Sequence, residues 1–122
     1  MVKKTKNETL TGLLKNLEGS VDIEASSVVS IDGFMIASAL PQDAQKDRVA
    51  VMSAAMHSLG ETTARELGRG ELSEVYVKGE NGSVVLIPSG DYAVLTTLTK
   101  NDGLDGVFHD MRRTAQEVAE LI

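Results

Sequence analysis

The protein is a chain of 122 residues with a formal net charge of −6, a sequence pI of about 4.8 and no cysteine. This length fits a single domain with one hydrophobic core. The acidic balance is opposite to that of nucleic-acid-binding domains, and with only two Phe and two Tyr the chain offers no platform for stacking bases. The lack of cysteine excludes disulfides and cysteine metal sites and fits a cytoplasmic protein. No apolar run is long enough to span a bilayer and the polar start is unlike a signal peptide, so no membrane insertion is expected.

Three elements are predicted before the longest helix. Four leucines at helical spacing between positions 10 and 17 predict a helix over residues 7–18, with Gly19 just beyond its end. A strand rich in Val and Ile follows over 21–31. The Asp-Gly pair after it predicts a hairpin turn, because both residues tolerate positive φ, and a return strand over 34–39.

Five further elements are expected after residue 40. The stretch 42–68 predicts a long helix, and residues 72–78, 83–87 and 92–99 predict three strands separated by turn sequences. Charged residues on one face of the first of these strands indicate an edge position. Asn101 or Asp102 is expected to cap a last helix with an apolar stripe from Leu104 to Leu121.

These elements follow the order α-β-β-α-β-β-β-α. The middle strands are apolar on consecutive residues, so both faces of the sheet are expected to be covered. The predicted fold class is therefore α/β, a three-layer α/β/α sandwich around a five-stranded antiparallel sheet. Residues 1–6 are expected to form a flexible N-terminus, and residues 7–122 a single domain.

The long helix is predicted to contact protein on both sides. Its more apolar stripe, interpreted as the face on its own sheet, consists of Val49, Met52, Met56, Leu59, Thr63 and Leu67. The opposite face is mostly small, and between residues 49 and 60 no side chain is charged when His57 is neutral, which is unusual for a solvated face. We interpret that face as a dimer interface, consisting of Ala50, Ala54, His57, Ser58, Glu61, Ala64 and Arg65. The alternative is a partly solvated helix in which alanine serves helix propensity.

No catalytic or metal-binding pattern stands out. His57 and His109 lie on different predicted helices without a clear set of further ligands. No serine lies in a nucleophile-elbow sequence, and no segment matches a phosphate-binding loop or a dinucleotide fingerprint. We therefore expect no enzyme activity, no catalytic residue, no metal and no cofactor.

Several segments together resemble a known family. They are Leu17-Glu18-Gly19, the run Val29-Ser30-Ile31-Asp32-Gly33-Phe34-Met35-Ile36-Ala37-Ser38, the long Ala/Ser/Met helix, Glu74-Val75-Tyr76-Val77-Lys78, Val84-Val85-Leu86-Ile87-Pro88 and the closing helix over 101–122. In order and spacing they resemble the Roadblock domain family, which includes the Roadblock-type dynein light chains and the bacterial MglB proteins. The resemblance covers nearly the whole chain, and the Asp-Gly-x-x-Ile-Ala-Ser segment is its most specific piece.

The resemblance implies a fold, an assembly and a function. The long helix would cover one sheet face and the terminal helices the other. Two chains, identical or different, would pack their long helices and pair their third strands, which adds Glu74, Tyr76 and Lys78 to the predicted interface. Family members bind Ras-like small GTPases, sometimes stimulating GTP hydrolysis, or act as scaffolds, without catalytic chemistry of their own.

We therefore expect a non-catalytic homodimeric regulator or binding platform for a Ras-like small GTPase. The candidate GTPase contacts are Arg48, Arg65 and Arg69, because stimulation by an arginine finger needs an exposed arginine. For Arg65 and Arg69 the alternative is a simple preference for the helix C-terminus.

Two other functions stay open. One is a nucleotide-independent scaffold or adaptor subunit of a motor, kinase or signalling assembly, which nothing in the sequence separates from the GTPase platform. The other is a small-ligand sensor, which the low aromatic content and the few convergent polar groups disfavour.

Overall fold

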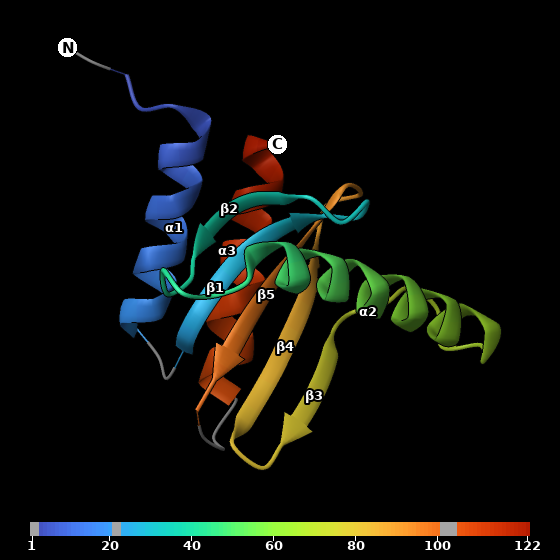
Figure 1. Cartoon of the computed structure of the whole chain (residues 1–122). Coiled ribbons are helices and arrows are strands. Elements are labelled where there is room, and N and C mark those ends of the chain that lie inside the picture. The colour runs from blue at the N-terminus through green and yellow to red at the C-terminus, as the bar shows by residue number, and fades with distance from the viewer. Residues whose placement is uncertain (1–2, 21–22, 101–104) are drawn as a thin grey trace.

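The computed structural model of the chain describes residues 3–20, 23–100 and 105–122. Its elements are α1 (Lys6–Ser20), β1 (Ile23–Ser30), β2 (Met35–Ala39), α2 (Lys46–Glu66), β3 (Val75–Gly79), β4 (Gly82–Ser89), β5 (Ala93–Thr99) and α3 (Asp105–Leu121). The five strands form one antiparallel sheet in the order β2-β1-β5-β4-β3. Helices α1 and α3 cover one face and α2 crosses the other (Figure 1). The predicted α/β/α sandwich and the predicted order of elements are confirmed.

Several boundaries differ from the prediction. Helix α2 begins at Lys46, after a turn in which the Ala44 N–H donates to the Pro41 carbonyl. Strand β4 continues through Pro88, which pairs with Val94 of β5 beyond the last pair between β3 and β4. One side of β4 is unpaired there, and a proline without an N–H is tolerated at such a position. The predicted cap at Asn101 or Asp102 lies outside the described residues.

Helix α1 begins one residue before the predicted domain boundary, because Thr5 caps it. The Thr5 hydroxyl accepts a hydrogen bond from the Glu8 N–H and donates one to the Glu8 carboxylate. Thr5 is therefore an N-cap whose hydroxyl satisfies one of the free N–H groups at the helix start.

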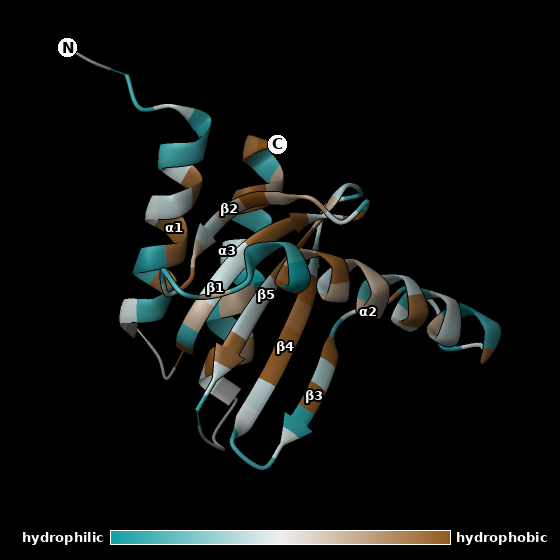
Figure 2. Ribbon diagram, in the orientation of Figure 1, coloured by the Kyte–Doolittle hydropathy of each residue, from teal (hydrophilic) through white to brown (hydrophobic). Residues whose placement is uncertain are grey.

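The face covered by α1 and α3 holds the main hydrophobic core. Leu10, Leu14 and Leu17 of α1 are buried, as are Val107, Met111, Ala115 and Val118 of α3. They pack against strand residues such as Val28, Val85 and Leu95. The brown residues of α1 on its side toward the sheet in Figure 2 belong to this core.

On the opposite face of the sheet, helix α2 does not have the predicted orientation. The helix buries Ala50, Ser53 and His57 against its own sheet, whereas Met52, Leu59 and Leu67 are 56 %, 68 % and 69 % exposed. Of the predicted core stripe, Met56 is half-buried and packs against the cluster of Val29, Ala50, Leu86 and Val94. The two faces were therefore assigned the wrong way round.

The small side chains explain this orientation because they let α2 approach the strands closely. A Cβ added at Gly60 would lie 2.9 Å from Cγ2 of Val75. Ser53 also accepts a hydrogen bond of 2.9 Å from the Thr96 hydroxyl of β5, so its buried hydroxyl has a partner. The small face is thus the contact between α2 and its own sheet.

Candidate functional site

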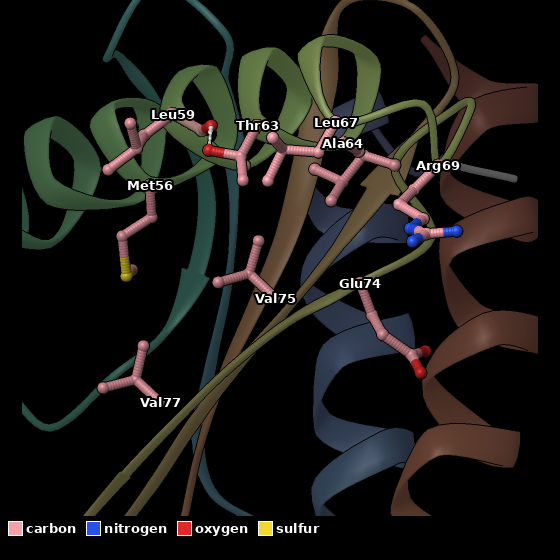
Figure 3. A pocket seen from close by; sticks show the side chains of 11 residues that line it. Met56, Leu59, Thr63, Ala64, Leu67, Arg69, Glu74, Val75 and Val77 are labelled. Atoms are coloured by element: carbon pink, nitrogen blue, oxygen red, sulfur yellow. Dashed lines mark hydrogen bonds between the residues drawn. The ribbon is translucent and has the colours of Figure 1, made fainter.

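An apolar groove lies between the second half of α2 and strand β3 (Figure 3). It has a volume of about 760 Å³. Met56, Leu59, Gly60, Thr63, Ala64 and Leu67 of the helix segment and Arg69, Leu72, Glu74, Val75 and Val77 beyond it line the groove. In the close-up, Met56 extends from the helix toward the strand, and Val75 extends from the strand toward the helix. The C-terminal end of α2 extends past the β3 edge of the sheet (Figure 1).

The groove is open although its walls are apolar. Leu59 and Leu67 are each more than two-thirds exposed, and Val77 is 46 % exposed. The one hydroxyl on the helix wall, that of Thr63, donates to the Leu59 carbonyl at 2.7 Å and is therefore satisfied within the helix. Large apolar side chains gathered on one exposed surface are typical of an interaction site.

Strand β3 borders the groove as an edge of the sheet. It pairs with β4 on one side, and among the described residues no strand pairs with its other side. The strand is fixed to the domain through α3: Arg112 Nη2 lies 3.0 Å from Oε2 of Glu74, and the Tyr76 and Phe108 rings lie 6.1 Å apart. Arg112 also lies over the Phe108 ring, 5.6 Å from its centroid. An ordered strand with one free edge is a template for pairing with a further strand.

The other edge of the sheet is partly covered. The Asn7 side chain of α1 donates to the Ile36 carbonyl of β2 at 2.8 Å. This bond satisfies a backbone acceptor on the strand that forms the second edge. The two edges thus differ: a side chain of α1 is bonded to the β2 edge, whereas β3 borders the apolar groove.

Below α2, part of the sheet face is also uncovered. Val77, Val84 and Leu98 are consecutive partners across β3, β4 and β5, on the same side of the sheet as α2. They line a second depression of about 410 Å³ at the end of the sheet away from α2. The apolar surface of the groove therefore continues onto the sheet.

The residues that were predicted for the interface differ in burial, and only some of them line the groove. Ala50 and His57 are buried against the chain's own sheet, so they offer little surface to a second chain. Ala64 and Glu74 line the groove. Ala54 and Glu61 are half-buried, and Ser58, Arg65, Tyr76 and Lys78 are exposed. The interface itself stays a prediction, now centred on the opposite face of α2.

Sequence reasoning missed Met56, Leu59, Thr63 and Leu67 as groove residues because it placed them in the core. The available signal was the small face: a helix that lies close to a sheet needs Ala, Gly and Ser at the contact. Of the candidate GTPase contacts, Arg69 lines the groove and Arg48 is exposed near the start of α2. Arg65 lies 3.6 Å from Glu61 and 3.8 Å from Glu71.

Two further observations concern the described residues as a whole. Over residues 3–20, 23–100 and 105–122, no group of three or more His, Cys, Asp or Glu side chains is arranged to hold a metal ion. Within the same residues, no helix combines the length and the hydropathy needed to cross a bilayer.

Comparison with known proteins identifies the family. The Roadblock/LC7 domain matches residues 6–99. The chain belongs to the Roadblock/LC7 domain family. Two uncharacterised proteins of Methanocaldococcus jannaschii are each 33 % identical to it over 111 residues, which cover 89 % of this chain and 96 % of each relative.

Solved structures of low sequence identity share this Roadblock/LC7 fold. An MglB structure described as having a tetrameric arrangement superposes with a TM-score of 0.87 at 18 % identity, covering 99 % of this chain and 93 % of the other. The gliding protein MglB of Thermus thermophilus superposes with a TM-score of 0.86 at 17 % identity and the same coverage.

Proposed function

We propose that this Roadblock/LC7 protein is a non-catalytic homodimer that serves as a binding platform for a Ras-like small GTPase. The observation that carries the dimer is the combination of an open apolar groove with the unpaired edge of β3. A lone chain would leave Leu59, Leu67 and Val77 in water. Their burial is favourable by roughly 25 cal/mol per Å² of apolar surface.

A two-fold arrangement would bury these surfaces together. If the β3 strands of two chains pair edge to edge, the sheets become continuous and each α2 extends over the partner. The end of α2 beyond the sheet edge would then cover the partner's exposed sheet face around Val77, Val84 and Leu98. An interface of this kind uses the same patch on both chains, as a two-fold dimer requires.

The dimer is tested by placing charge in the groove. We expect Leu59→Glu to convert the dimer into a monomer, because a carboxylate would be desolvated at the interface without a partner. The matched control is Val51→Glu, an exposed apolar residue of the same helix that does not line the groove. Light scattering should give half the parent mass for the first variant and the parent mass for the second. A parent chain that is already monomeric would overturn the proposed dimer.

The GTPase platform is supported by membership of a family of regulators and adaptors. The three candidate arginines differ in exposure and in ion pairing. Arg48 makes no ion pair with another described residue and is exposed, whereas Arg65 lies between two carboxylates and Arg69 lies in the groove. We therefore place Arg48 first among them.

Capture from host lysate tests the GTPase proposal. The tagged chain is incubated with GDP or with a non-hydrolysable GTP analogue, and the bound proteins are identified by mass spectrometry. A small GTPase retained with the GTP analogue alone is the expected result. Partners retained equally with both nucleotides, with no GTPase among them, would instead favour the nucleotide-independent scaffold.

A further inference from the structure

The layer between α2 and the sheet contains few large apolar side chains. Among the described residues, its hydrophobic cluster has four buried members, whereas the cluster under α1 and α3 has fourteen. Helix α2 itself buries Ala50, Ser53 and His57, of which only the alanine is apolar. Because hydrophobic stabilisation grows with the apolar area that is buried, we expect the sheet to hold α2 less tightly than it holds the other two helices.

Polar groups occupy part of the same layer. The Thr96 hydroxyl donates to the Ser53 hydroxyl at 2.9 Å, which places Thr96 of β5 under α2. Ser27 of β1 pairs with Thr96, and directly opposite residues share a face of the sheet, so Ser27 also lies on the α2 side. The Ser27 hydroxyl is buried and has no hydrogen-bond partner among the described residues. Water that reached this hydroxyl would stabilise it, which offsets part of the free energy needed to separate α2 from the sheet.

The rest of the domain does not need α2 for its own contacts. Segments 40–45 and 67–74 connect the helix to β2 and β3. The five strands pair with one another, and the main core lies on the other face, under α1 and α3. Strand β3 is also held from the α3 side, by the ion pair of Arg112 with Glu74. A chain whose α2 has left the sheet would therefore keep its strands, its two other helices and its main core.

Helix α2 is poorly equipped to stay helical once it has left the sheet. Its N-cap residue, Gln45, makes no side-chain hydrogen bond to the first turn. Gly60 lies in its interior, where glycine is unfavourable. Most of the stability of a protein helix comes from packing against the rest of the fold. Separation from the sheet would therefore expose the backbone amides of α2 to solvent, which makes the separation measurable.

We propose that, in the single chain, α2 separates from the sheet as one cooperative unit while α1, α3 and the five strands stay folded. Weakly packed elements open in this way, at a free energy below that of global unfolding. A second copy suppresses the opening, because it covers the exposed apolar residues of α2 from outside. This coupling rests on the proposed dimer. Assembly then controls access to the sheet face beneath α2.

Hydrogen exchange of the full chain, followed by mass spectrometry, tests the opening. The monomer is the Leu59→Glu variant, or the parent itself if light scattering shows that the parent is already monomeric. Leu59 is exposed, so its replacement leaves the contact of α2 with the sheet intact. We expect α2 amides in the monomer to exchange at least about 100-fold faster than amides of α1 and α3. Equal rates in the three helices would overturn the proposal.

The same measurement on a dimeric parent tests the coupling. The dimer should slow exchange in α2 by at least about tenfold relative to the Leu59→Glu monomer. If the parent is a dimer and α2 exchanges equally fast in both, the coupling is wrong and the dimer stands. If the parent is monomeric, the dimer is wrong, and the exchange of α2 relative to α1 and α3 still decides whether the helix opens separately.

Two variants in the monomer distinguish local opening from global unfolding. Val118 of α3 stays buried when α2 separates, so Val118→Ala should speed exchange in α1 and α3 by about tenfold and leave α2 unchanged. Ser53→Ala leaves the Thr96 hydroxyl without its partner and should speed exchange in α2 by about fivefold. Equal acceleration of all three helices by Val118→Ala would show that α2 opens only in global unfolding, which contradicts the proposal.

Thiol labelling gives an independent measurement, because the chain has no cysteine of its own. Ser53→Cys places a thiol under α2. The matched control is Ser89→Cys, which places a thiol under α3, where the Ser89 hydroxyl donates to the Ala115 carbonyl. Both serines are 1 % exposed. In the monomer, the first variant should react with a thiol reagent at least about 100-fold faster than the second. Equal reaction rates would overturn the separate opening of α2.

Discussion

The two faces of the sheet are covered in different ways. Helices α1 and α3 bury long side chains, such as Leu14 and Met111, which are 0 % exposed. Helix α2 buries an alanine, a serine and a histidine, and leaves its larger apolar residues in solvent. Figure 2 shows brown segments along α2 that continue past the sheet edge. The first face serves the stability of the chain, and the second leaves apolar surface available for a partner.

The largest expected effect compares leucines from the two faces. Leu14→Ala should reduce the free energy of unfolding by about 2–5 kcal/mol, because it leaves a cavity in the core. Leu59→Ala should change that free energy by less than about 1 kcal/mol in the isolated chain, because this side chain is already 68 % exposed. Urea unfolding measures both free energies, at protein concentrations low enough for a dimer to dissociate. Equal losses would mean that α2 is as much a core helix as α1.

Two glycines provide the next comparison. A Cβ at Gly60 would meet Val75 at 2.9 Å, whereas a Cβ at Gly12 in α1 would meet nothing within 4 Å. Gly60→Ala should destabilise the chain by about 1–2 kcal/mol, since the clash outweighs the gain in helix propensity. Gly12→Ala should stabilise it by about 0.5–1 kcal/mol. Thermal unfolding with shifts of opposite sign would confirm that small residues set the distance between α2 and the sheet.

A smaller effect concerns the start of α1. Thr5→Ala removes both hydrogen bonds between Thr5 and Glu8 and should cost about 1 kcal/mol of stability. Thr5→Ser, which keeps the hydroxyl, is the control and should restore most of the loss. Denaturant midpoints measure the difference. If both variants match the parent, the cap contributes nothing, and the start of α1 does not limit stability.

The smallest expected effect depends on pH. Partial burial raises the pKa of the Glu18 carboxyl in α1 above its ordinary value. The folded chain therefore holds this proton more tightly than the unfolded chain, and the Glu18 contribution to stability falls as the pH rises through the folded pKa. Glu18→Gln should be slightly more stable than the parent at about pH 7 and equal to it below about pH 4, where both side chains are neutral.

Urea unfolding at the two pH values measures the Glu18 difference. Glu120→Gln, a change at an exposed carboxyl of α3, is the control and should give the parent's midpoint at both. A gain in stability of Glu18→Gln that is the same at both pH values would assign the effect to packing rather than to the charge.

The two elements that border the groove could be located from the sequence, but the face of α2 that lines it could not. The length and composition of α2 indicated contact with protein on two sides, and the charged positions of β3 indicated an edge strand. The choice of faces failed because both stripes of α2 repeat with the same helical period, so the period cannot tell which one meets the sheet. The apolar stripe was assigned to the core on hydropathy, whereas close approach to the sheet requires the small residues.

The contact between two turns was equally inaccessible to sequence reasoning. Ile31 and Tyr92 are far apart along the chain, and Tyr92 is predicted as the start of an ordinary strand. Their backbones become neighbours because β1 pairs with β5, which brings the β1–β2 and β4–β5 turns to the same end of the sheet. Sequence periodicity describes single elements and carries no record of which turns are adjacent.

The sequence by itself determined the order of the elements, the presence of a covered antiparallel sheet and the absence of cysteine chemistry, because these depend on local pattern and composition. The tertiary structure decided which face of α2 is buried, which sheet edge borders the apolar groove and which distant turns lie side by side. Those properties depend on the distance between packed layers, which Gly60, Ala50 and Ser53 set only once the strands are in place.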